Sequence, residues 1–146
     1  EYASELAGGA GWPTDPALRA IARAISAEMH SGFAALRGTW SMQAASRGLQ
    51  VPLTPLGRAD VERIDAIWSD CRRHHGQRGP WLFGERYCIA DAMYAPVVLR
   101  FMTYGPALSA PARGYLENAL ADPHLQEWIR GAEFEVTAEG RPLEHP

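Results

Sequence analysis

Apolar residues recur at helical spacing along most of this chain. From Asp15 to about Met42 they follow one another in steps of three and four, which is one face of a helix. Asp15 and Pro16 form a start signal, because a capping carboxylate precedes a proline in the first turn. The pattern predicts a long helix with an inward face made of Leu18, Ile21, Ile25, Met29, Phe33, Leu36 and Trp40.

Two further helices are predicted on either side of a glycine-containing loop. Pro52 and Pro55 exclude a continuous helix, and a new one is expected from about Leu56 to Arg73. Residues 76–85 read as a loop. The next helix, Ile89 to about Tyr104, is apolar on nearly every side, which is typical of a buried helix.

The remaining pattern predicts two shorter helices and a polar tail. One helix runs from about Ala112 to Leu120, and a second is announced by Asp122 and Pro123. No segment alternates with the period of two that is typical of strands. We therefore expect an all-α bundle around a central buried helix, with a helical domain over residues 16–135 and a C-terminal tail over 136–146.

Composition narrows the class of protein. The 146 residues suit one domain, and 47% of them are hydrophobic, which is enough for a packed core. The net charge of -3 disfavours nucleic acid as a partner. No apolar run approaches the ~20 residues of a membrane span. Two cysteines are too few for a disulfide framework, so a cytoplasmic location is expected.

The start of the buried helix carries the most specific local signal. Cys88 stands at the cap position, and Asp91 stands three residues later, where its carboxylate can accept the amide of the cap residue. Sulfur is a weaker acceptor than a hydroxyl oxygen, so the Cys88 half of this capping box should be the weaker one.

The stretch from Trp81 to Pro96 resembles the sixth helix and its lead-in in cytosolic glutathione transferases, where the cap residue is normally Ser or Thr. Residues 15–33 resemble the fourth helix of that family. Glu1 to Glu5 look like the end of the third helix of its thioredoxin-like first domain. Residues 1–15 would then be a remnant of that domain and a linker, and the activating Ser, Tyr or Cys would lie upstream of this chain.

The resemblance implies a transferase of bacterial type that forms a homodimer. It also implies glutathione as co-substrate, a hydrophobic electrophile as second substrate, and no metal. No catalytic residue is expected here, and the isolated chain should be inactive. The family's electrophile pocket maps onto Met29, Phe33, Arg37, Phe101 and Tyr104. A non-catalytic interaction module of the same fold is the alternative. A zeta-type isomerase is a further alternative, although it would carry Gln-Pro where this chain has Ala34 and Ala35.

Spacing alone leaves several of these residues open to a plain structural role. Met29, Phe33 and Arg37 form one ridge of a helix, and such a ridge is more often core and solvated surface than a pocket. Cys71, His74 and His75 lack a second ligand pair at zinc spacing. Cys88 at a helix N-terminus could be a reactive thiol, but its apolar neighbours favour a buried cap. Ser4, Ser26 and Ser31 have no evident His–Asp partners for a hydrolase triad.

Overall fold

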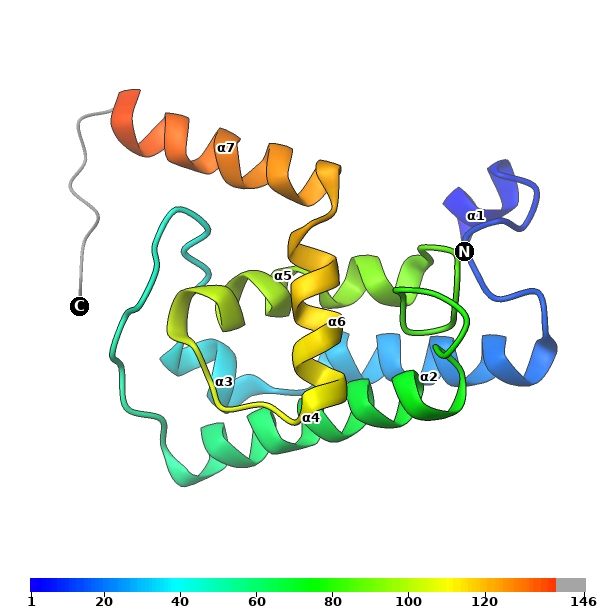
Figure 1. Ribbon diagram of the computed structural model, residues 1–146, viewed down its shortest axis with the longest axis horizontal. Coiled ribbons are helices and arrows are strands. Elements are labelled where there is room, and N and C mark those ends of the chain that lie inside the picture. The colour runs from blue at the N-terminus through cyan, green and yellow to red at the C-terminus, as the bar shows by residue number, and fades with distance from the viewer. Residues whose placement is uncertain (139–146) are drawn as a thin grey trace.

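A computed structural model of the chain describes residues 1–138, and every regular element in this part is a helix (Figure 1). The helices are α1 (Tyr2–Leu6), α2 (Pro16–Ser31), α3 (Ala34–Thr39), α4 (Pro55–His74), α5 (Ile89–Tyr104), α6 (Ala110–Leu120) and α7 (Pro123–Ala138). The all-α prediction is therefore confirmed. Among the described residues, no helix is both long and apolar enough to cross a membrane.

The single long helix predicted up to Met42 is wrong, because the chain breaks into α2 and α3 at Gly32 and Phe33. Gly32 leaves the helix with extended backbone angles, and a Cβ atom here would lie 2.7 Å from the carbonyl oxygen of Glu28. Phe33 then adopts a left-handed conformation, with φ of 58°. This conformation is uncommon for a bulky residue and is held here by burial of the phenyl ring.

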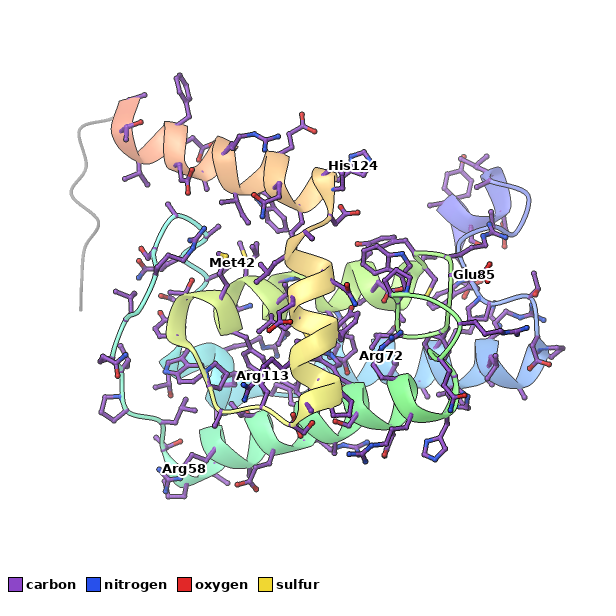
Figure 2. All side chains as sticks on the ribbon, in the orientation of Figure 1. Met42, Arg58, Arg72, Glu85, Arg113 and His124 are labelled. Carbon is purple, nitrogen blue, oxygen red and sulfur yellow. The ribbon has the colours of Figure 1, made fainter. Side chains whose placement is uncertain are left out.

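Helix α4 matches its prediction to within one residue at each end, and Arg72 near its C-terminus organises the loop that follows. The Arg72 guanidinium donates hydrogen bonds to the carbonyl oxygens of Gly76 and Gly79, both at 2.7 Å, and to that of Trp81. Figure 2 shows Arg72 between α4 and this loop. The loop is thereby tied to α4, and it places Leu82 in the core.

Helix α5 begins and ends at the predicted residues and lies at the centre of the core. The α4 side chain Trp68, which is completely buried, contacts three aromatic rings around it. The ring centroids of Tyr94, Phe101 and Tyr115 lie 5.8, 5.3 and 4.9 Å from that of Trp68. Gly105 ends α5 in the left-handed conformation that glycine adopts without steric cost. The prediction of a central buried helix is confirmed.

Helix α6 is anchored to α4 at its start, whereas the start of α7 is held by its own capping residue, Asp122. Asp65 on α4 accepts hydrogen bonds from both the backbone N–H and the hydroxyl of Ser109, at 2.9 and 3.0 Å, just before α6 begins. Helix α7 packs mainly on α6 and runs away from the bundle in Figure 1. Its last residues, 136–138, fall in the segment expected to be tail. The rest of that expected tail, 139–146, lies outside the described residues.

Candidate functional site

Four of the five residues mapped to an electrophile pocket, all except Arg37, are buried in the hydrophobic core. Met29 lies in the last turn of α2, Phe33 lies between α2 and α3, and Phe101 lies on α5 against Trp68. The break at Gly32 takes Met29 and Phe33 off a common helical ridge. Burial of these side chains in the described chain fits the plain structural interpretation of the ridge, and their role in a pocket stays a prediction.

The remaining two mapped residues, Tyr104 and Arg37, lie where α3 and its exit meet the C-terminal turn of α5. The ring of Tyr104 stacks on that of Trp40, with centroids 4.8 Å apart and planes 3° apart. The Tyr104 hydroxyl donates to the carbonyl oxygen of Ser41 at 3.1 Å. Arg37 is only partly covered, and its guanidinium donates to the carbonyl oxygen of His30 at 3.2 Å. Arg37 therefore keeps donors free for a ligand.

Sequence reasoning missed Arg100, which lies close to both of these residues. Burial and the neighbouring Arg37 charge lower the pKa of Arg100, while Tyr104 acts in the opposite direction. The Arg100 guanidinium donates to the carbonyl oxygens of Trp40 at 2.9 Å and Pro96 at 3.3 Å. An arginine within the otherwise apolar helix Ile89–Tyr104 is the sequence signal that could have indicated it. Two guanidinium groups near each other favour an anionic group between them.

The predicted capping residues form a buried network at the start of α5. The Asp91 carboxylate accepts the backbone N–H of Cys88 at 2.9 Å, and the reciprocal half of the capping box is also present. Its second oxygen accepts the N–H of Leu82 at 3.1 Å. Burial raises the pKa of Asp91 above 3.8, although both amide hydrogen bonds lower it. Asp91 thus links a helix end to a loop.

Neither cysteine offers a reactive thiol. Burial raises the pKa of Cys71 and of Cys88 to about 12, and nearby carboxylates act in the same direction. Both thiols are buried and unpaired with each other. At neutral pH they are protonated, so they cannot act as nucleophiles. The interpretation of Cys88 as a buried cap is therefore favoured over that of a reactive thiol.

The remaining candidates do not assemble into a metal site. The rings of His74 and His75 lie 6.1 Å apart, and His75 stacks instead on Phe83 at 5.9 Å. Within residues 1–138, no three His, Cys, Asp or Glu side chains lie close enough to hold one metal ion. Each of Ser26 and Ser31 donates its hydroxyl to the carbonyl oxygen four residues earlier. The hydroxyl groups of these two serines are therefore engaged by the backbone of α2.

A cavity of about 730 Å³ lies between the loop before α5, the first half of α5, α6 and the start of α7. Asp91 and Tyr115 contribute its buried polar groups. Most of the wall is apolar or aromatic. The residues lining the cavity are Trp81, Tyr87, Asp91, Ala92, Ala95, Tyr115, Ala119, Asp122, His124, Leu125 and Trp128. None of the five residues mapped to an electrophile pocket is among them.

These features define an all-α domain with one aromatic core, a capped central helix and no activated nucleophile among its cysteines. Residues 17–131 match the family described as glutathione S-transferase, C-terminal domain. The chain belongs to this family, and the resemblance seen in its sequence is thereby confirmed. No curated protein matches the chain.

A solved structure supports the same fold. The crystal structure of a glutathione transferase homologue from Burkholderia GL BGR1, with bound glutathione, is 23% identical to this chain and superimposes with a TM-score of 0.59. The match covers 90% of this chain and 62% of the other chain. The chain therefore spans less than two thirds of the length of this relative, and the likeness shows the fold.

Proposed function

We propose that this chain is the helical domain of a glutathione transferase and acts together with a glutathione-binding domain that precedes it. The observation that carries the proposal is the family match over residues 17–131. The relative bound to glutathione supports it, because more than a third of that protein has no counterpart here. In this proposal the helical domain shapes the electrophile pocket and part of a homodimer interface, in a cytoplasmic enzyme.

The polar end of the pocket would be formed by Arg37 and Arg100. The charges of Arg37 and Arg100 influence each other, and Arg100 is already fixed by two backbone carbonyl groups. Such an arrangement is preorganised to orient a carboxylate or nitro group of an electrophile. The buried side chains of Met29, Phe33 and Phe101 would support this wall from behind, within the core.

Thiolate activation would belong to the preceding domain. Cys71 and Cys88 are buried, and their raised pKa of about 12 keeps both thiols protonated at neutral pH. We therefore expect the chain as printed not to conjugate glutathione, since activation of the nucleophile is the step that a transferase must supply.

A non-catalytic interaction module remains the second candidate, favoured by exposed apolar side chains on α1 and α7. Leu6 is 73% exposed and Phe134 is 71% exposed. Such residues are suited to a protein partner as well as to a preceding domain. The zeta-type isomerase stays a further alternative within the enzyme class.

The test is conjugation of glutathione to a chromogenic aryl halide, measured for the printed chain and for the full-length gene product. We expect no turnover above background for the printed chain and clear turnover for the full-length protein. Full-length protein that folds but neither binds nor conjugates glutathione would favour the interaction module. Turnover by repurified protein that consists of these 146 residues alone would contradict the assignment of thiolate activation to a preceding domain.

A further inference from the structure

The cavity beside α5 contains a buried hydroxyl group, that of Tyr115, which makes no hydrogen bond within 3.5 Å although the Asp91 carboxylate lies near enough to influence its pKa. Tyr115 on α6 is 1% exposed, and its oxygen has no hydrogen-bond partner among the described residues. The ring itself packs on Trp68, so the side chain is fixed in position. An unpaired buried hydroxyl is costly unless something occupies the space beside it. Because Tyr115 lines the cavity, that space is the cavity itself.

Two carboxylates face the same cavity. Asp91 lies at its floor with both oxygens engaged by amides, and Asp122 lies near its mouth. One oxygen of Asp122 accepts the amides of His124 and Leu125, at 3.0 and 3.1 Å, at the start of α7. Asp91 and Asp122 both raise the pKa of Tyr87, which burial brings to about 12. Both carboxylates therefore contribute negative charge to the same cavity.

The charge balance of the cavity favours a cation. When both are ionised, the two carboxylates supply about -2, and the N-termini of α5 and α7, which they cap, return about +0.5 each. Neither lysine nor arginine is among the described residues that line the wall, and His124 is the one histidine there. A net charge of about -1 remains inside a partly enclosed space, where electrostatic attraction is stronger than in water.

Aromatic rings form the wall around these acceptors. The rings of Trp81 and Tyr87 meet edge to face, with centroids 4.8 Å apart. Tyr87 and Trp128 are 46% and 44% exposed, so large apolar surfaces line the cavity where it opens. Indole and phenol faces attract cations through their quadrupoles, and they also cover the apolar body of a ligand.

We propose that this cavity is a binding site for a small organic cation, namely a protonated amine carried on an aromatic or aliphatic body. The ammonium group donates to the oxygen of Tyr115 and is attracted by Asp91 and Asp122. The apolar body lies among Trp81, Tyr87 and Trp128. The site is separate from the proposed electrophile pocket at Arg37 and Arg100, and it needs neither glutathione nor a preceding domain.

Three matched probes test the proposal on the printed chain. They are 2-naphthylmethylamine, which is a cation at neutral pH, the neutral 2-naphthylmethanol, and the anion 2-naphthoate. Binding is followed by calorimetry and by perturbation of the tryptophan indole N–H signals in NMR spectra. We expect the amine to bind about tenfold more tightly than the alcohol and the carboxylate to bind more weakly still. Equal affinities for all three probes would show a merely apolar groove and overturn the proposal.

Paired variants locate the site. Tyr115→Phe removes the unpaired hydroxyl, and we expect it to weaken amine binding about tenfold while leaving the fold intact. Tyr94→Phe is the matched control, because the Tyr94 hydroxyl donates to the carbonyl oxygen of Ile25 and does not line the cavity. Its affinity for the amine should equal that of the parent. Equal losses in the two variants would overturn the assignment.

A charge variant separates electrostatic attraction from packing. Asp122→Asn keeps a side chain that caps α7 well but removes one negative charge. We expect it to weaken the amine several-fold and to leave 2-naphthylmethanol unchanged. Unchanged amine affinity in both Asp122→Asn and Tyr115→Phe would overturn the proposal. Since none of these measurements uses glutathione, their failure is distinct from failure of the transferase assay.

Discussion

The backbone N–H of Leu82 donates a 3.1 Å hydrogen bond to the buried carboxylate of Asp91, nine residues further along the chain. The same carboxylate accepts the N–H of Cys88, which opens α5. One side chain thus fixes the loop that buries Leu82 and the first turn of the central helix. Because both donors are buried, water cannot replace the carboxylate if it is removed.

Replacement of Asp91 by Ala should destabilise the domain by about 1–3 kcal/mol, since two buried amides lose their acceptor. Urea unfolding followed by circular dichroism gives the free energy of unfolding. Cys88→Ser is the companion variant. A hydroxyl is a better acceptor than a thiol, so this change should be neutral or stabilising. An Asp91→Ala variant with the unfolding midpoint of the parent would contradict the capping role.

The pKa of Asp91 also predicts how stability depends on pH. Burial holds this pKa above 3.8, so the folded state keeps the proton at pH values where the unfolded state releases it. The contribution of Asp91 is therefore full below pH 3.8 and declines as pH rises through the folded pKa. The free energy of unfolding of the parent, relative to Asp91→Asn, should therefore fall as pH rises above about 4. A difference that grows with pH over this range would reverse the sign and refute the assignment.

Local patterns predicted the helices well where local forces decide the outcome. The limits of α5 were predictable because Cys88 and Asp91 mark its start and a glycine follows Tyr104. The break between α2 and α3 was not, because the apolar spacing continues through Phe33 without interruption. A left-handed phenylalanine is fixed by tertiary burial, which spacing does not reveal. Gly32 was the one local sign of the break.

Long-range relationships account for what the sequence did not reveal about the candidate sites. Spacing predicted that Asp91 would bind the amide of Cys88, but the amide of Leu82 reaches it only through the fold of the loop. Arg100 approaches Arg37 because the residue that ends α3, Trp40, lies against α5. The cavity with Tyr115 depends on how α6 and α7 leave the bundle. None of these relationships is encoded at helical spacing.

The two cysteines should resist modification in the folded protein. With a pKa of about 12, only about one thiol in ten thousand is ionised at pH 8. An aromatic disulfide reagent should therefore react with neither Cys71 nor Cys88 until urea unfolds the chain, when both react. The released chromophore measures the reaction, and mass spectrometry locates it. Rapid modification of Cys88 without urea would restore the reactive-thiol interpretation.

The electrophile pocket requires a test in the full-length protein, because its second wall is assigned to the preceding domain. If Phe33 and Tyr104 act only as core, replacing Phe33 by Ala costs about 3–5 kcal/mol and affects both substrates through unfolding. If they also support a pocket wall, variants that remain folded should raise KM for the electrophile more than KM for glutathione. The left-handed backbone of Phe33 offers a control. Phe33→Gly removes the same ring but relieves about 1–2 kcal/mol of backbone strain, so it separates loss of the ring from loss of stability.

Arg37 gives the sharper version of the same test, because its partly exposed guanidinium contributes little to the core. Arg37→Ala should leave the unfolding midpoint nearly unchanged and raise KM for a carboxylate-bearing electrophile about tenfold, with a smaller effect on a neutral one. Arg73→Ala is the matched control, since this exposed arginine lies near the end of α4. A guanidinium that orients an anionic group must distinguish charged from neutral electrophiles, whereas one that only solvates the surface cannot. If Arg37→Ala changes KM by the same factor for the carboxylate-bearing and the neutral electrophile, Arg37 does not belong to the pocket.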